Sequence, residues 1–143
     1  TNELPKPAVI KFGEHKIWWG QGRAIAQEVH TFVNQQIEIY CESNAYEHDF
    51  AKKQFEDKSI KFDFVLDDGP HTLKSMVSCI ELYHNLLTPK GILIIEDVQS
   101  IGWFKELKNA TPDHLKKHVK TYDLRKNKKR YDDLVFTIDK LNK

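Results

Sequence analysis

The chain has 143 residues, and its 22 Lys and Arg side chains nearly balance its 21 Asp and Glu side chains. This length predicts a single domain over residues 1–143, large enough to bury a core but short for a two-lobed enzyme. The balanced charge argues neither for nor against a polyanionic partner. No run approaches the roughly 18 apolar residues of a membrane span and no secretory signal is expected, so the sequence predicts no membrane association.

The two cysteines, Cys41 and Cys79, fall in a predicted strand and on the apolar side of a predicted helix. Two buried thiols are therefore expected in place of a disulfide. Because free thiols persist in reducing compartments, the sequence predicts a cytoplasmic location.

The N-terminal part is predicted to alternate strands and helices. Two strand-like segments are followed by a Gly-x-Gly element, a helix with an apolar stripe and a third apolar strand. These segments are, in order, Ala8–Phe12, His15–Trp19, Gly20–Gly22, Arg23–Asn34 and Gln36–Cys41. The next segment, Asn44–Asp57, is predicted to be one polar helix with Tyr46 and Phe50 facing inward.

Gly20 and Gly22 lie between a predicted strand and a predicted helix, and Glu42 follows the next strand. In Rossmann-like nucleotide-binding folds, glycines at this turn let the backbone approach the ligand, and an acid about 20 residues later binds ribose hydroxyls. The order and spacing therefore predict a nucleotide-type site. A simple strand-to-helix turn is the alternative, and the bulky Trp18-Trp19 pair before the glycines favours that alternative.

The middle of the chain contains two apolar runs that both end in acids, with a helical pattern between them. The segments are Phe62–Leu66 followed by Asp67-Asp68-Gly69, Leu73–Leu87, and Ile92–Ile95 followed by Glu96-Asp97. Strand, helix and strand of this length predict a βαβ unit with parallel strands. Because the carboxyl ends of parallel strands meet at one edge, four carboxylates and His71 are expected to share a ligand-binding rim.

The C-terminal part is predicted to form a short helix over Ile101–Lys108 and then an antiparallel hairpin. The alternating segments His118–Leu124 and Leu134–Ile138 flank a basic, turn-rich run, RKNKKRYDD. All the elements together predict one α/β domain. Its compact, Rossmann-like sheet is expected to be mostly parallel and to end in the antiparallel C-terminal hairpin.

At this point the residues resemble a known family. The run FDFVLDDGPHT, followed by a helix, LLTPKGILIIEDV and a terminal hairpin, resembles the class I S-adenosylmethionine (SAM) methyltransferases. It is most similar to the metal-dependent O-methyltransferases that act on sugars in macrolide biosynthesis and to their cephalosporin-hydroxylase-like relatives, which carry DDGSH and ED elements. The resemblance covers about Phe62–Ile138, and Pro70 stands where the family has Ser.

The resemblance implies roles for particular residues. In that family the second Asp of DDG and the ED pair bind magnesium, which implies Asp68, Glu96 and Asp97 as metal ligands here. The His of the first element, His71, is then the candidate general base. The SAM site is expected at Gly20, Gly22, Glu42 and Asp67.

The chemistry of these side chains agrees with that assignment. Three carboxylates at one rim repel one another and shift their pKa values unless a cation lies between them. Hard oxygen ligands with at most one His select Mg²⁺, Mn²⁺ or Ca²⁺. Such a metal lowers the pKa of a substrate hydroxyl, and an imidazole with a pKa near about 6.5 can take the proton. In the alternative interpretation, the acids only end strands and cap helices, which explains Asp67 and Asp97 individually.

The expected function is a SAM-dependent, divalent-metal-assisted O-methyltransferase for a small hydroxylated acceptor, of which a sugar is one candidate. One alternative is a degenerate methyltransferase-fold module that binds or assembles without catalysis. Another is a nucleic-acid methyltransferase or binder that uses the basic run Arg125–Arg130. A solvated hairpin tip is the preferred interpretation of that run, because no aromatic platform is interleaved with it. The chain also lacks NPPY-like and Pro-Cys elements, so nucleic acid is disfavoured, while a homo-oligomer that completes the site is compatible with the sequence.

Overall fold

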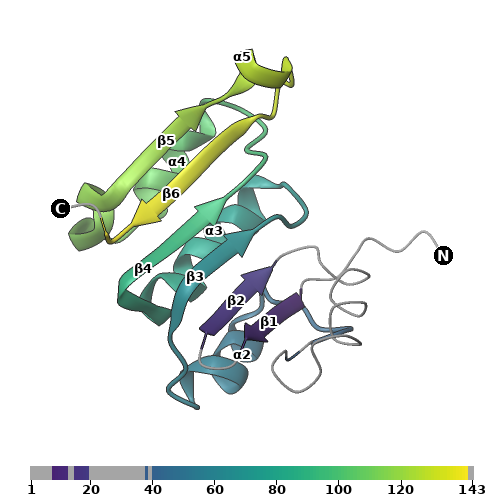
Figure 1. Cartoon of the computed structure of the whole chain (residues 1–143), viewed down its shortest axis with the longest axis vertical. Coiled ribbons are helices and arrows are strands. Elements are labelled where there is room, and N and C mark those ends of the chain that lie inside the picture. Colours follow the sequence, from purple (N-terminus) through teal and green to yellow (C-terminus); the bar gives the residue numbers. More distant parts are fainter. Residues whose placement is uncertain (1–7, 13–14, 20–37, 39, 142–143) are drawn as a thin grey trace.

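The chain forms a six-stranded sheet in the order β1-β2-β3-β4-β6-β5 (Figure 1). The structure is a computed structural model that describes residues 8–12, 15–19, 38 and 40–141. The strands are β1 (Ala8–Phe12), β2 (His15–Trp19), β3 (Phe62–Asp67), β4 (Leu87–Ile95), β5 (Val119–Asp123) and β6 (Leu134–Asp139). The α-helices are α2 (His48–Ala51), α3 (Leu73–Tyr83), α4 (Trp103–Ala110) and α5 (Arg125–Lys128). Shorter helical turns are the π-helical Lys52–Glu56 and the 3₁₀ segments His84–Leu86 and Asp113–His118.

The sheet is mixed. Strand β3 pairs in parallel with both β2 and β4, whereas the pairs β1–β2, β4–β6 and β5–β6 are antiparallel. The predicted βαβ unit and the predicted C-terminal hairpin are therefore confirmed. The expectation of a mostly parallel sheet is not confirmed, because antiparallel pairs occur at both ends of the described sheet. A hairpin adds an antiparallel strand with only a short connection, whereas each parallel strand needs a crossover of a dozen or more residues.

The unit β3–α3–β4 forms the centre of the molecule. The Thr72 hydroxyl accepts a hydrogen bond from the Ser75 backbone N–H at 3.1 Å, and the Ser75 hydroxyl lies 3.3 Å from the Thr72 nitrogen, which closes a capping box at the start of α3. The helix ends at Tyr83, and β4 already begins at Leu87. The predicted start of this strand at Ile92 was too late, because a register irregularity opposite Phe62–Phe64 extends the pairing toward the helix.

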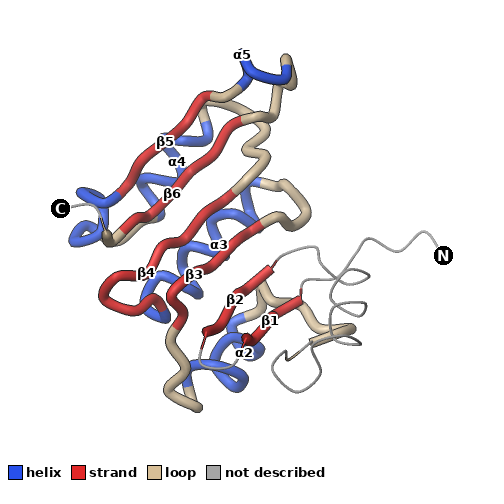
Figure 2. Tube along the Cα trace, in the orientation of Figure 1, coloured by secondary structure: helices blue, strands red, loops and turns tan. Residues whose placement is uncertain are grey.

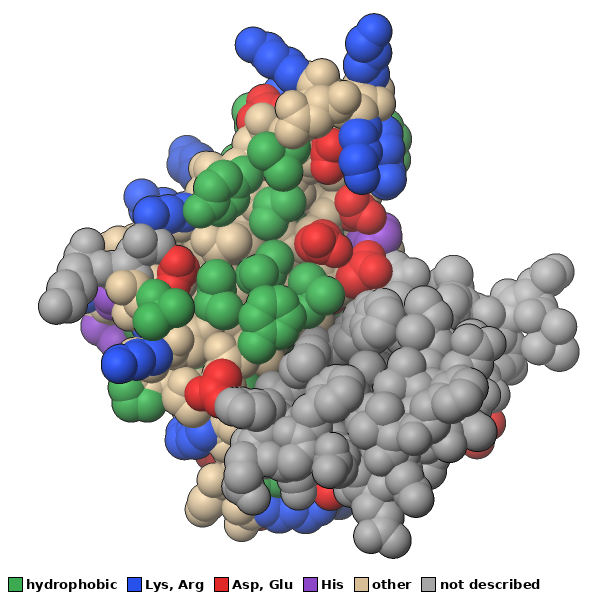
Figure 3. All heavy atoms as spheres, viewed as in Figure 1, with side chains coloured by type: hydrophobic (Ala, Val, Ile, Leu, Met, Phe, Trp, Pro, Cys, Tyr) green, Lys and Arg blue, Asp and Glu red, His purple; other side chains and the backbone are tan. Residues whose placement is uncertain are grey.

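The helices α2, α3 and α4 lie on one face of the sheet (Figures 1 and 2). Alternate residues of β4 and β6 point to that side and are fully buried, among them Leu93, Ile95 and Phe136. Their neighbours Ile92 and Ile94 point to the other face and are only partly buried. No helix of the described residues covers this second face, on which Figure 3 shows hydrophobic side chains gathered. The described structure therefore has two layers.

An aromatic cluster joins the segment before α2 to the sheet. Tyr40 packs edge-on against Phe50 and Phe55, with ring centroids 5.5 and 5.8 Å away, and Phe55 packs edge-on against Phe62. The buried Tyr83 hydroxyl donates a 2.7 Å hydrogen bond to the carbonyl of Ala45. Of the predicted strand Gln36–Cys41, the described residues Glu38, Tyr40 and Cys41 belong to no strand, and the others lie outside the described residues. Cys41 and Cys79 are free thiols.

We predict that Gly91→Ala lowers the free energy of unfolding by about 1–3 kcal/mol, because overpacking of a tight backbone contact has this cost. A Cβ at this position would lie 2.9 Å from the carbonyl oxygen of Phe62 and 3.1 Å from the backbone nitrogen of Thr88. Urea unfolding measures the change. The control is Gly102→Ala, whose Cβ would lie 3.6 Å from the Ser100 hydroxyl and should change stability by less than about 0.5 kcal/mol. Equal losses in the two variants would contradict the steric argument.

Candidate metal centre

The two acidic strand ends meet at one edge of the sheet, as the βαβ unit predicts. In the register of the parallel pair, Asp67 of β3 lies opposite Ile95 of β4. One residue further on, the Glu96 backbone N–H donates a 3.0 Å hydrogen bond to the carbonyl of Asp67. The loops that begin at Asp68 and at Glu96 therefore start side by side.

Asp68, His71 and Asp97 converge in these two loops. One ligand atom from each side chain lies within 4.8 Å of the others, and all three side chains are partly buried. The Nε2 atom of His71 lies 3.1 Å from Asp68 Oδ1 and 3.7 Å from Asp97 Oδ2. A single imidazole nitrogen thus lies between two carboxylates.

Two of these residues have a strained backbone. His71 has a φ of 56° and Asp97 a φ of 53°, both in the left-handed region that non-glycine residues seldom adopt. Such conformations cost about 1–3 kcal/mol each and concentrate at functional sites, where the surroundings hold them in place. The strain therefore supports a functional interpretation of the cluster.

Like charges gather at this edge. Burial raises the pKa of Glu96, and the neighbouring carboxylates of Asp68 and Asp97 raise it further. Burial likewise raises the pKa of Asp97, although the charges of His71 and Arg130 oppose the rise. A cation placed among these carboxylates would remove the repulsion, because it favours their charged forms.

The donor set fits a hard divalent cation. Metal–oxygen distances of about 2.1 Å for Mg²⁺ place neighbouring ligand atoms of an octahedron about 3 Å apart, so the loops would close slightly around the ion. The carboxylates of Asp68 and Asp97 suit Mg²⁺ or Mn²⁺, and no thiol belongs to the cluster. Glu96, the third predicted ligand, does not contribute an atom to the group of three, although its charge interacts with that of Asp68 and Asp97.

Asp67 lies behind the cluster and is almost fully buried, with 2% of its surface exposed. Its Oδ1 accepts hydrogen bonds from the Tyr46 hydroxyl and from the Gly69 backbone N–H. Its Oδ2 is buried and has no nitrogen or oxygen hydrogen-bond partner among the described residues, while the Cys79 thiol interacts with the carboxyl. Burial raises the pKa of Asp67 to about 6, against the effect of these hydrogen bonds.

Gly69 is required by this packing. A Cβ at this position would lie 1.7 Å from the Tyr46 hydroxyl and 2.8 Å from Asp67 Oδ1. The turn between β3 and His71 therefore depends on a tyrosine that stands 21 residues before Asp67. Sequence reasoning predicted that Tyr46 faces inward but missed this contact, because no local spacing signals a partner so far along the chain.

The tip of the β5–β6 hairpin also reaches the cluster. The guanidinium of Arg130 lies 3.7 Å from Asp97 Oδ1. The Gln99 side-chain amide donates a 2.8 Å hydrogen bond to the carbonyl of Asp97, and its oxygen accepts one of 2.7 Å from the Tyr131 hydroxyl. Sequence reasoning treated this tip as solvated and missed these residues. The strand order could have indicated this contact. β6 begins beside the end of β4, where Ile95 pairs with Phe136, so the loop before β6 lies next to Asp97.

The predicted SAM residues are only partly described. Gly20 and Gly22 lie outside the described residues, and the strand before them ends with Trp19 paired to Leu66, at the same edge as the end of β3. Glu42 is exposed, has a left-handed φ of 58° and lines a surface depression of about 390 Å³. It does not belong to the group around His71.

Comparisons with protein-family models, with curated proteins and with solved structures gave no significant match. Among the helices of the described residues, none has the length and apolar character needed to cross a bilayer.

We predict that Asp67 makes the protein less stable as the pH rises from about 4 to about 7. The pKa of Asp67 is about 6 in the folded protein, against 3.8 for the carboxyl in water. Its contribution to stability is therefore complete below about pH 4 and is lost as the pH rises through about 6, by roughly 3 kcal/mol in all. Asp67→Asn should remove this part of the pH dependence in urea unfolding without divalent cations.

A second variant tests the cause. Tyr46→Phe removes a hydrogen bond that lowers the pKa of Asp67, so the loss of stability should move to higher pH. In the Asp67→Asn background the same change should have no pH-dependent effect. Parallel pH profiles for the natural chain and Asp67→Asn would show that the carboxyl is not the source.

Proposed function

We propose that this protein is a SAM-dependent, divalent-metal-assisted O-methyltransferase that acts on a small hydroxylated acceptor, of which a sugar is one candidate. The observation that carries the proposal is the convergence of Asp68, His71 and Asp97 at the adjoining carboxyl ends of β3 and β4. The resemblance of the same two elements, DDGPH and ED, to the metal-dependent O-methyltransferases also supports it.

The strand arrangement supports a Rossmann-like methyltransferase sheet. Three neighbouring strands, β2, β3 and β4, run in the same direction. The last strand, β6, inserts between β4 and β5 and runs antiparallel to both. A sheet of this kind binds its ligand outside the carboxyl ends of the parallel strands, where the acidic cluster lies.

The residues of this chain would perform three tasks in methyl transfer to oxygen. Asp68 and Asp97 would hold the cation, with Glu96 as the third acid beside them. His71, whose imidazole lies beside both carboxylates, would take the hydroxyl proton as general base. When bound, the metal lowers the pKa of the acceptor hydroxyl and SAM supplies the methyl group. The partly buried position of the cluster would limit competition from water.

The proposal assigns SAM binding to Gly20, Gly22, Glu42 and Asp67. Asp67 could take this role through its buried Oδ2, for which no nitrogen or oxygen atom of the described residues is a hydrogen-bond partner. Its anchor Tyr46 joins the segment that contains Glu42 to the same edge of the sheet. The free thiols of Cys41 and Cys79 support the proposed cytoplasmic location.

A degenerate binding or assembly module that keeps the fold but has lost SAM is the second candidate. The observation in its favour is that the described residues of the segment before Glu42, namely Glu38, Tyr40 and Cys41, form no strand. In a complete Rossmann-like site, the ribose-binding acid follows a strand. Binding of SAM separates the two candidates.

We predict that SAM and S-adenosylhomocysteine each bind with micromolar dissociation constants in isothermal titration with Mg²⁺ present. Circular dichroism of the same sample would show that the protein is folded. Micromolar binding supports the methyltransferase over the module. Failure of both ligands to bind to the folded protein would contradict the proposed function.

We also predict that Mn²⁺ binding, followed by the electron paramagnetic resonance of the free ion, weakens in Asp68→Asn and in Asp97→Asn. Loss of a residue that hydrogen-bonds to a metal ligand already lowers metal affinity about 10–100-fold, so loss of a ligand itself should lower it at least about 10-fold. The matched control is Asp63→Asn near the other end of β3, where the carboxylate accepts a hydrogen bond from Thr88. His71→Gln should bind Mn²⁺ almost normally; a loss as large as that of Asp68→Asn would make His71 a ligand and refute its assignment as the base.

A further inference from the structure

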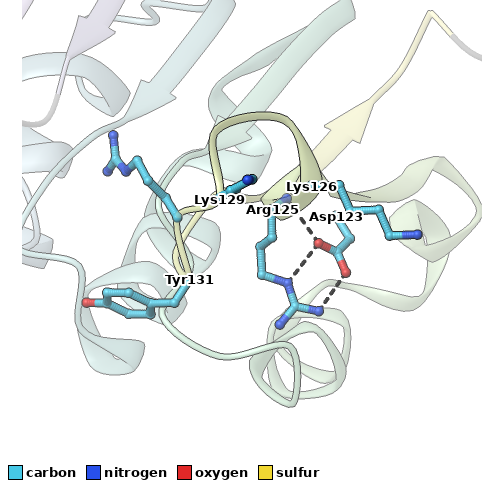
Figure 4. A pocket seen from close by; sticks show the side chains of 6 residues that line it. Asp123, Arg125, Lys126, Lys129 and Tyr131 are labelled. Atoms are coloured by element: carbon cyan, nitrogen blue, oxygen red, sulfur yellow. Dashed lines mark hydrogen bonds and ion pairs between the residues drawn. The ribbon is translucent and has the colours of Figure 1, made fainter.

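A basic pocket lies at the tip of the β5–β6 hairpin, next to the candidate metal centre. It has a volume of about 400 Å³ and is lined by Asp123, Arg125, Lys126, Lys129, Arg130 and Tyr131 (Figure 4). Four of these six side chains are cationic and one is a carboxylate. The pocket is shallow and open to solvent, since five of its six lining residues are exposed.

One ion pair is satisfied inside the pocket. The guanidinium of Arg125 donates two hydrogen bonds to the Asp123 carboxylate, at 2.8 and 2.7 Å, and Figure 4 shows this pair beneath the short helix α5. The ammonium groups of Lys126 and Lys129 make no ion pair within the described part of the chain. The pocket therefore retains positive charge that its own acid does not neutralise.

An aromatic ring completes the lining. Tyr131 is 68% exposed, yet its hydroxyl is held by Gln99, which in turn donates a hydrogen bond to the backbone carbonyl of Asp97. An exposed ring that is fixed at its polar end offers an apolar surface with little loss of side-chain freedom on binding. The aromatic platform that sequence reasoning did not find is the residue directly after the basic run.

Arg130 connects the pocket to the metal centre. Its guanidinium lines the pocket and lies 3.7 Å from Asp97 Oδ1 and 3.4 Å from Asp132 Oδ1. Asp97 is itself one of the three residues of the candidate metal centre. A ligand that occupies the pocket therefore binds one side chain away from the proposed site of methyl transfer.

We propose that this pocket binds the phosphate group of a small phosphorylated acceptor whose hydroxyl reaches the metal centre. Lys126 and Lys129 pair with the phosphate, and the ring of Tyr131 packs against the organic part. A phosphate dianion suits the site because charge-assisted hydrogen bonds to two ammonium groups satisfy several of its oxygens at once. The role of the ligand as methyl acceptor rests on the proposed function, whereas phosphate binding itself does not.

The surroundings favour a small ligand over a nucleic acid. Asp132 and Asp133 follow the pocket along the chain, and Asp97 and Glu96 lie on the adjoining rim. An extended polyanion that continued in this direction would meet these carboxylates. A single phosphate avoids them because it ends inside the pocket.

The test is a titration of the folded full chain with a hexose phosphate, with the free hexose and with inorganic phosphate, followed by two-dimensional NMR of the backbone amides. The hexose phosphate should bind at least about 10-fold more tightly than the free hexose and shift the amide signals of residues 123–131. The double variant Lys126→Gln/Lys129→Gln should lose about 10-fold or more in affinity for both phosphates. Tyr131→Ala should weaken the hexose phosphate but leave inorganic phosphate unchanged.

Lys128→Gln is the matched control, since Lys128 carries the same charge in α5 but does not line the pocket. An equal loss in this variant would show that only net charge matters and would overturn the proposal. Absence of hexose phosphate binding would overturn it as well. So would single-stranded RNA that binds more tightly than the hexose phosphate and is weakened as much by Lys128→Gln as by the double variant. SAM titration of the same samples separates the two proposals: phosphate binding without SAM binding refutes only the methyltransferase, and SAM binding without phosphate binding refutes only the pocket.

Discussion

The geometry of the candidate site depends on the buried carboxyl of Asp67. Its Oδ1 receives the Tyr46 hydroxyl and the Gly69 N–H, and its own carbonyl receives the N–H of Glu96. One residue therefore joins the segment before α2, the turn after β3 and the loop after β4. Burying a carboxyl is costly, which the raised pKa of Asp67 expresses. The hydrogen bonds from Tyr46 and Gly69 offset part of this cost, and the same contacts hold the turn that carries Asp68 beside the loop that carries Asp97.

Electrostatic repulsion at the rim is only partly relieved by the chain itself. His71 lies between Asp68 and Asp97, and Arg130 reaches Asp97 from the hairpin tip. The pKa of Glu96 is nevertheless raised, by burial and by the two aspartates. The guanidinium of Arg130 lies 3.7 Å from Asp97 Oδ1, whereas a divalent ion contacts carboxylate oxygens at about 2.1 Å. The remaining repulsion between these carboxylates is not expected of isolated acids that only end strands.

Local patterns predicted the centre of this fold well. Short apolar runs predicted β3 and β4, and alternating residues predicted β5 and β6. Each of these patterns is visible within a few residues, because strand periodicity is a local property. The acidic rim followed from the parallel direction of β3 and β4 alone. The mostly parallel sheet and the strand before Glu42 were not confirmed, because strand neighbours and aromatic packing of Tyr40 depend on contacts distant in sequence. The contact of Tyr46 with Asp67 escaped prediction for the same reason.

The direction of β6 explains why the basic tip belongs to the site. Because β6 runs antiparallel to β4, its first residues lie where β4 ends, with Phe136 opposite Ile95. The loop that precedes β6 must therefore lie on the rim that carries Asp97. The strand direction alone places any loop before β6 close to the acids. Two residues of this loop also make specific contacts with the rim: Arg130 with the Asp97 carboxylate, and Tyr131 with Gln99, which hydrogen-bonds to the Asp97 carbonyl. Strand direction thus brings cations, an aromatic ring and an acidic cluster together, and the proposed binding of a phosphorylated, hydroxyl-bearing ligand rests on this combination.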